Sequence, residues 1–355
     1  MTSNSSGPAA PAAPGSGATR LADRVFRMRE LTIAVVLLVM LGVTQAGNSQ
    51  FLTEQGIKDL LLNATILVLV ATGQALVVIT RNVDLSVGSV LGVSAFAAGT
   101  YLQGGGSPLV AVLLAVLLGV GFGLLNGLLV SFGQVPALVV TLGTLYIIRG
   151  IDSLWVGSRQ ITAADLPDAF VDFGSGGLSA VPYLGLIALA VLAATAYYLK
   201  HFAGGRELYA LGSDPQAARL AGIPVRRRIL IAYTFCGALA GLAGALYLAR
   251  FGNVDSGTGN GYELTVVSAV VVGGVVFTGG AGSVYGAALG ALLLTSVNSV
   301  LPALGVSSVW VLAINGALLV LAIAADRIVA LRVAEALRKK SAPQTVPQKG
   351  DPLHA

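Results

Sequence analysis

A short polar stretch at residues 81–86 lies between two long apolar runs. It reads Arg81, Asn82, Val83, Asp84, Leu85 and Ser86. Ionisable groups at membrane depth are costly and usually face a cavity or a partner. One interpretation is a loop in which Arg81 and Asp84 pair at the level of the lipid headgroups. The other is a broken helix whose freed backbone groups, with Asn82, Asp84 and Ser86, line the path of a solute, because irregular backbone needs protein or water around it.

Isolated amides and hydroxyls lie within other apolar segments. They are Asn63, Gln74, Asn126, Thr141, Thr144, Asn298 and Asn315. Such side chains hydrogen-bond either a polyol or another helix, and bonding between helices is the commoner use. We add Asn126, Thr141 and Thr144 to the polar stretch as candidate residues of a solute path.

A second local signal is a helix start at residues 213–216, which read Ser-Asp-Pro-Gln. Asp214 can cap a helix that begins at Pro215, or the serine can cap it with the glutamine three residues on. Gly222 and Pro224 then end a helix of about two turns. Its small apolar face consists of Ala217, Leu220 and Ala221. That face either packs back onto the protein or inserts into a groove of a cytoplasmic partner.

The residue types needed for catalysis or metal binding are almost absent from the sequence. There are two histidines, His201 and His354, and one cysteine, Cys236, which we interpret as a small buried hydrophobe. A phosphate-binding loop needs a Gly-Lys pair, and the sequence contains none. We therefore expect no enzyme activity, no metal, no cofactor and no ATP site in this chain.

The composition indicates that these residues are positioned by membrane helices. Of 355 residues, 55% are hydrophobic and 10% are charged, against roughly 25% charged in an ordinary soluble domain. The mean hydropathy is +0.84, and 46 glycines suit closely packed helices in lipid. A soluble enzyme is excluded. The net charge of +5 lies in loops without interleaved aromatic residues, so we expect no nucleic-acid partner.

The predicted fold is an all-α polytopic membrane protein with about ten transmembrane helices, some of them short or broken. A span needs roughly 20 residues. The apolar segments are 31–46, 60–79, 85–102, 108–132, 136–148, 180–199, 229–249, 262–277, 284–301 and 307–324. Two of them, 136–148 and the glycine-interrupted 262–277, are short enough to be re-entrant or discontinuous.

The distribution of basic residues predicts that both termini are cytoplasmic. With the N-terminus inside, only Lys58, Arg149, Arg159 and Arg250 of the 21 Lys and Arg residues fall in outer segments. The expected organisation is a disordered tail with a basic flank (1–30), a membrane domain (31–325) and a basic C-terminal tail (326–355). Within the membrane domain, 200–228 is a cytoplasmic loop. The long outer loop 149–179 carries Asp152, Asp165, Asp168 and Asp172 and is a candidate docking face for an extracytoplasmic partner.

Three co-linear motifs resemble those of permease subunits of ribose-type ABC importers. They are ITRNVDLSVGS at 79–89, PALVVTLGT at 136–144 with Arg149-Gly150 after it, and GRELYALGSDPQAARLAGI at 205–223. The likeness extends from about residue 31 to residue 325. Thr80-Arg81-Asn82 looks more like the rhamnose and autoinducer-2 branch than the ribose branch.

The resemblance implies a multi-pass subunit of the bacterial inner membrane. It would import a monosaccharide such as rhamnose or ribose, or a related small polyol. Its partners would be a second permease subunit (identical or related), cytoplasmic ATP-binding subunits that hydrolyse the ATP, and an extracytoplasmic sugar-binding protein. The stretch 205–223 would couple to the ATPase. The residues assigned to coupling are Glu207, Gly212, Asp214, Ala217, Ala218 and Gly222.

The runner-up function is a secondary transporter driven by protons or sodium. Asp84 and Glu263 are the plausible ion carriers within the membrane for that mechanism. A passive channel is a third possibility, although no filter motif supports it. Uptake driven by an ion gradient would indicate the secondary transporter, and uptake without any energy source would indicate the channel. Neither is expected of an ATP-driven importer.

Overall fold

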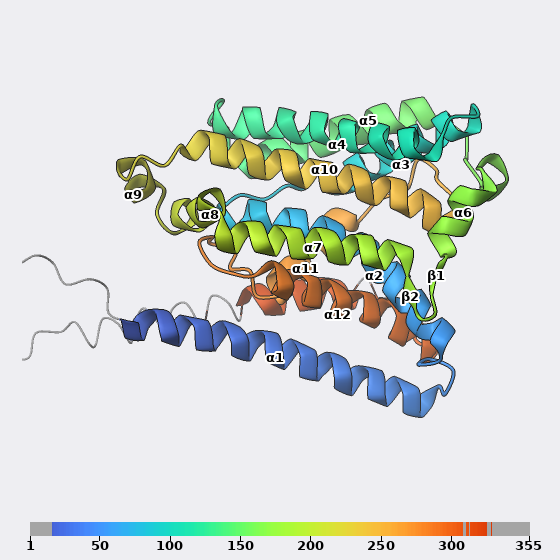
Figure 1. Ribbon diagram of the computed structural model, residues 1–355, viewed down its shortest axis with the longest axis horizontal. Helices are drawn as coiled ribbons and strands as arrows, with labels where there is room; N and C mark the ends of the chain where they lie inside the picture. Colours follow the sequence, from blue (N-terminus) through green and yellow to red (C-terminus); the bar gives the residue numbers. More distant parts are fainter. Residues whose placement is uncertain (1–15, 308–309, 312, 325–327, 329–355) are drawn as a thin grey trace, which may run out of the picture.

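The computed structural model describes residues 16–307, 310–311, 313–324 and 328. In these residues the protein is a bundle of helices lying roughly along one direction (Figure 1), so the predicted all-α polytopic fold is confirmed. Seven of the described helices are long and apolar enough to cross a membrane. They are α1 (Ser16–Gly47), α2 (Glu54–Ile79), α4 (Pro108–Ser131), α5 (Ala137–Val156), α7 (Tyr183–His201), α10 (Val225–Phe251) and α12 (Val284–Ala303).

The remaining predicted segments correspond to shorter helices. They are α3 (Val87–Gln103), α11 (Tyr262–Val272) and Ala313–Ala324. The predicted interruption of 262–277 is confirmed, because α11 ends at Val272 and Gly274 has a φ of +94°. The predicted shortness of 136–148 is wrong. There α5 continues for 20 residues, through the two charged residues that end the apolar run. Arg149 and Asp152 are compatible with the helix because they form an ion pair at 4.0 Å, one turn apart.

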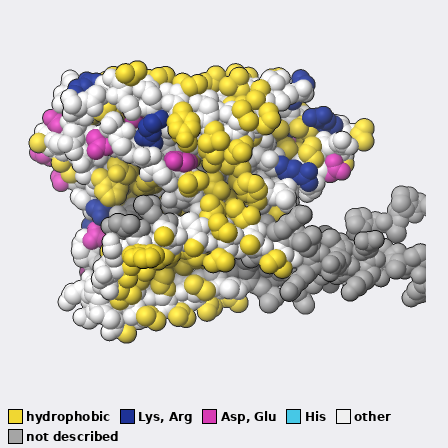
Figure 2. Space-filling view, turned by 180° about the vertical axis from the view of Figure 1, so that it is seen from behind, with side chains coloured by type: hydrophobic (Ala, Val, Ile, Leu, Met, Phe, Trp, Pro, Cys, Tyr) yellow, Lys and Arg dark blue, Asp and Glu magenta, His cyan; other side chains and the backbone are white. Residues whose placement is uncertain are grey.

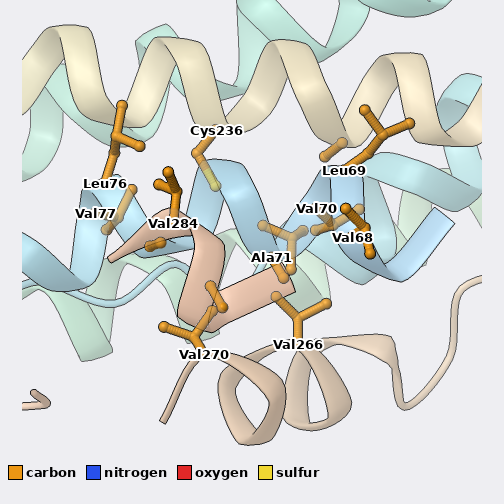
Figure 3. Close-up of a cluster of buried hydrophobic side chains, with 14 of the residues drawn as sticks. Val68, Leu69, Val70, Ala71, Leu76, Val77, Cys236, Val266, Val270 and Val284 are labelled. Atoms are coloured by element: carbon orange, nitrogen blue, oxygen red, sulfur yellow. The ribbon is translucent and has the colours of Figure 1, made fainter. Parts of the chain in front are cut away.

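Helix α2 is the central element of the bundle. Its apolar residues are distributed around the whole helix, as expected for a buried helix, and Ala64 to Ile79 are all buried. It packs against α10, α12, α7 and α11. Figure 3 shows α2 side chains such as Val70 and Ala71 between α10 and α11. Cys236 of α10 is buried in the same cluster, which confirms its interpretation as a core residue.

Small residues allow α4 and α10 to approach at backbone distance. Gly119 and Gly123 on α4 face Gly237 and Gly241 on α10. A Cβ atom on Gly119 would lie 2.9 Å from the nitrogen of Gly241 and would overlap the carbonyl oxygen of Gly237. Close packing of this kind stabilises helix pairs in lipid, where no hydrophobic force drives helices together.

The two ends of the bundle carry different short elements (Figure 1). At one end lie η1 (Ala163–Asp165), α6 (Asp168–Ser175) and an antiparallel pair, β1 (Gly177–Leu178) with β2 (Val181–Pro182). At the other end lie α8 (Ala203–Ser213), α9 (Pro215–Leu220) and the start of α1. Figure 2 shows hydrophobic side chains over the middle of one face and most of its acidic side chains at the α6 end.

The helix α1 begins earlier than the sequence predicted. It starts at Ser16, so residues 20–29, the predicted basic flank, are helical and continuous with the first apolar segment. The predicted disorder of residues 1–15 lies outside the described residues, and so does the basic tail 326–355 apart from Ile328.

Candidate functional site

The polar stretch 80–86 forms a break between α2 and α3. Arg81 adopts a positive φ of 65°, which turns the chain out of the helix. Its guanidinium donates to the carbonyl oxygen of Ser213 at 2.6 Å. Asp84 is only 1% exposed and lies inside the protein. The broken helix is therefore confirmed, and the predicted pairing of Arg81 with Asp84 at the headgroup level is wrong.

The backbone groups freed by this break are satisfied by side chains from three surrounding helices. The carbonyl of Val83 accepts from the hydroxyl of Tyr233 at 3.0 Å and from that of Thr141 at 3.3 Å. In the amide orientation that suits both partners, Gln74 pairs with the backbone oxygen and nitrogen of Asp84, at 3.2 and 3.1 Å. Buried irregular backbone is stable under these conditions.

The side chains of the break form one hydrogen-bonded cluster. The Oδ1 atom of Asp84 accepts from the backbone N–H of Ser86 at 2.9 Å and from its hydroxyl at 2.6 Å. The amide nitrogen of Asn126, on α4, donates to the Ser86 hydroxyl at 2.8 Å. The Oδ1 atom of Asn126 is buried and has no hydrogen-bond partner among the described residues. Asp84, Ser86 and Asn126 thus tie the start of α3 to α4.

Most of the predicted path residues are brought together here. Thr144 donates to the carbonyl of Thr141 at 3.3 Å, so it joins the cluster through that residue. Asn82 instead donates to the carbonyl and hydroxyl of Thr80, at 2.9 and 3.1 Å, which directs it toward the end of α2. In this conformation the buried cluster braces the helices, and its role in a solute path stays a prediction.

The predicted capped helix is confirmed. The Asp214 carboxylate accepts from the backbone N–H groups of Gln216 at 2.8 Å and Ala217 at 3.1 Å. The N–H groups of Ala217 and Gln216, with the charge of Arg81, hold the pKa of Asp214 below its usual value. Leu220 is 92% exposed. The apolar face of α9 therefore does not pack back onto the bundle.

The other predicted coupling residues anchor α8 and α9. Glu207 accepts a hydrogen bond from Arg228 at the start of α10. Ala218 is buried, and Gly222 ends the helical segment with a φ of +80°. A Cβ on Gly212 would overlap the carbonyl oxygen of Ile79, so α8 touches the end of α2 backbone to backbone.

Three segments far apart in sequence meet at this point. Besides the bond from Arg81 to Ser213, the backbone N–H of Gly280 donates to the carbonyl of Ile79 at 2.9 Å. The Tyr209 hydroxyl donates to the carbonyl of Gly282 at 3.0 Å, and burial raises its pKa to about 12, so it remains a donor at neutral pH. The end of α2, the end of α8 and the loop 273–283 therefore form one contact.

The acidic residues of the predicted outer loop differ in their surroundings. Asp168 and Asp172 are exposed. Asp165 is held by the backbone N–H and hydroxyl of Thr162, which lower its pKa. Asp152 lies within α5 and is fully buried, so it does not belong to the exposed face.

The sequence signals missed several of these contacts. Tyr233 lies in an apolar helix, where its type suggests an ordinary core residue. Arg81 and Ser213 are 132 residues apart, and no local pattern relates them.

Comparison with known proteins gives a consistent result. The family model described as "Branched-chain amino acid transport system / permease component" matches residues 56–323. The "Autoinducer 2 import system permease protein LsrC" of Enterobacter sp. (strain 638) is 37% identical over 286 residues, covering 81% of this chain and 83% of that protein. The proteins of the same name from Escherichia coli O157:H7 and Salmonella paratyphi B are each 36% identical over 282 residues. They cover 79% of this chain and 82% and 81% of their own lengths. No solved structure matches the chain.

Proposed function

Since the chain belongs to this family of transport permeases and is the permease subunit of an ABC importer in the inner membrane, we propose that it imports autoinducer 2 or a small polyol of similar size. The relatives named above support this solute more directly than rhamnose or ribose. The family description names branched-chain amino acids instead. Apart from the carboxylate of Asp84, the candidate path consists of amides and hydroxyls and contains no basic side chain. It therefore favours a neutral polyol over an amino acid, whose carboxylate needs a positively charged partner when buried.

The partners follow from this assignment. We propose that α9 docks into a cytoplasmic ATP-binding subunit, that a second permease subunit completes the membrane domain, and that the exposed acidic residues of 149–179 face a soluble binding protein. The α9 end of the bundle, where α1 begins, then faces the cytoplasm. The sparse basic residues of the outer segments support this orientation.

The observation that carries the proposal is the contact between the coupling region and the break. No described residue covers the apolar face of α9, and Leu220 is almost fully exposed. The residue before its cap, Ser213, is hydrogen-bonded to Arg81 at the start of the break. A displacement of α9 by an ATPase would therefore reach the cluster of Asp84, Ser86 and Asn126. In the proposed cycle this displacement separates the cluster and opens the solute path beside Asn82, Thr141 and Thr144.

The test uses the complex assembled from this permease and its ATP-binding and solute-binding partners in proteoliposomes. Ala217→Trp places a bulky ring on the docking face, and we expect solute-stimulated ATP hydrolysis to fall at least roughly tenfold, the effect of about 1.4 kcal/mol of lost binding. Ala217→Ser is the matched control, because it keeps a small side chain at the same exposed position. Hydrolysis by the Trp variant at the unmodified rate would contradict the proposal. Uptake driven by a proton gradient without ATP would favour the secondary transporter.

A further inference from the structure

A polar cavity of about 440 Å³ lies beside α2 at the end of the bundle opposite α9. Its size is within the range of small-molecule sites. It is open on one side and is lined by residues of α2, the end of α10, α11, α12 and the helix Ala313–Ala324. Asn63 marks its position on α2, 16 residues before Ile79, which is about 24 Å along a helix. We propose that this cavity binds the neutral polyhydroxylated solute before it reaches the break.

The wall of the cavity carries hydrogen-bonding groups with unused capacity. Four amides line it, from Asn63, Asn260, Asn298 and Asn315. Asn315 donates to the Oδ1 atom of Asn298 at 3.0 Å. The Oδ1 atoms of Asn63 and Asn315 are shielded from solvent and have no partner among the described residues. A buried acceptor without a donor is unfavourable, and a solute hydroxyl would supply the missing donor.

The cavity is suited to an uncharged ligand. None of the described side chains that line it is charged. The carboxylate of Glu263 lies near α3, where it would meet a Cβ atom on Gly88, and is not part of the wall. A sodium ion or an amino acid would therefore lack a counter-charge. The rings of Phe251 and Tyr262 supply the apolar part that polar-ligand sites combine with a few polar groups.

A second cavity of similar size provides a contrast. It measures about 410 Å³ and is lined mainly by apolar side chains such as Leu76, Val191 and Phe235. A cavity of that composition suits lipid chains. The amides of the polar cavity are not suited to lipid chains, because lipid cannot hydrogen-bond them, and the Oδ1 atoms left without a partner among the described residues show that bonds between helices do not satisfy them either.

The inference rests on the proposed import function, and the first experiment measures ATP-driven uptake of autoinducer 2 by the assembled complex. Asn63→Leu and Asn315→Leu replace each amide by an apolar group of similar size. We expect each to raise KM roughly 3- to 10-fold, the effect of one lost hydrogen bond, and the double variant to raise it further. Thr195→Val is the control, because it removes a hydroxyl from the apolar cavity, and its KM should not change.

The second measurement does not depend on the fold tolerating leucine. In a Cys236→Ala chain, Thr265→Cys places a single thiol in the cavity wall. A membrane-impermeant thiosulfonate added outside should label this thiol, and autoinducer 2 should slow the labelling several-fold. Unchanged KM in the double variant, or labelling that the solute does not slow, would overturn the inference while wild-type uptake stays intact. Slowing by sodium alone would also overturn it, by assigning the cavity to a cation. Absence of ATP-driven uptake by the wild-type complex would instead refute the proposed function.

Discussion

The contact between α4 and α10 predicts opposite effects for one substitution at two glycines of the same helix. Gly119 is buried against α10, whereas Gly121, half a turn away, has no atom within 4 Å of the position that a Cβ would take. Alanine at Gly121 should therefore be accommodated without movement. It should stabilise the helix by roughly 0.5–1 kcal/mol, because alanine loses less backbone entropy than glycine.

At Gly119 the added methyl group has no space. Its Cβ would lie 2.9 Å from the nitrogen of Gly241, where ordinary contacts begin at 3.4 Å, and it would overlap the carbonyl of Gly237. The helices must separate by more than about half an ångström, because the overlap with the Gly237 carbonyl exceeds the shortfall at Gly241. Overpacking of this kind costs roughly 1–3 kcal/mol. The neighbouring contacts of Gly123 and Gly237 would loosen as well. The expected difference between the two variants is about 1.5–4 kcal/mol.

The assay is thermal unfolding of the purified permease in lipid nanodiscs, with both variants and the unmodified protein in parallel. A change of 1 kcal/mol shifts Tm by roughly 2–4 °C in a protein of 150–250 residues and by less in a longer chain such as this one of 355 residues. The two variants should therefore be separated by a few degrees. Gly121→Ala should unfold at or above the temperature of the unmodified protein. If Gly119→Ala unfolds at the same temperature as Gly121→Ala, the backbone contact between α4 and α10 is not what holds this pair together.

Three further predictions concern the contact between the coupling region and the break. Arg81→Ala should reduce solute uptake roughly tenfold while ATP hydrolysis persists, because the hydrogen bond to the Ser213 carbonyl is lost. Arg81→Lys should restore part of the uptake. Full uptake by the alanine variant would contradict the proposed coupling route. The N–H group of Ala217 is the main cause of the lowered pKa of Asp214. The stabilisation of α9 by the Asp214 cap is therefore fully present above the ordinary pKa of 3.8 and is lost as pH falls through the lowered pKa. Hydrogen exchange of α9 should report that loss, and Asp214→Asn should keep the cap without the pH dependence. Tyr209→Phe removes the hydrogen bond to the loop before α12 and should lower the free energy of unfolding by about 1 kcal/mol, measured by denaturation, whereas no decrease would show that the bond is not stabilising.

The features that the sequence predicted correctly are those that local residue patterns encode. The apolar segments were found because a helix in lipid must be apolar over about 20 residues. The α9 cap was found because Asp214 and Pro215 satisfy the start of a helix with nearby atoms only. The break between α2 and α3 was found because Asp84 interrupts an apolar run. None of these depends on a distant part of the chain.

The features that were missed depend on contacts between distant segments. The length of α5 was underestimated because Arg149 and Asp152 end the apolar run. Arg149 is held within the bundle by donating to the carbonyl of Thr258 at 2.7 Å, a partner 109 residues away that no local pattern indicates. Helix α8 was missed although Leu208 and Leu211 are buried at helical spacing, because the whole of 200–228 was assigned to a loop outside the membrane. Arg81 was assigned to Asp84 because only a near partner is visible in sequence.

The central position of α2 connects the polar cavity beside Asn63 with the coupling region. Its surface is buried from Ala64 to Ile79, so it cannot shift without moving the helices around it. At its end, Gly212 and Gly280 contact the Ile79 carbonyl through backbone atoms. Backbone contacts of this kind transmit a displacement that a flexible side chain would absorb. In the proposed cycle, a force on α9 therefore moves α2 and the break together, and the cavity beside Asn63 responds because α2 forms one of its walls.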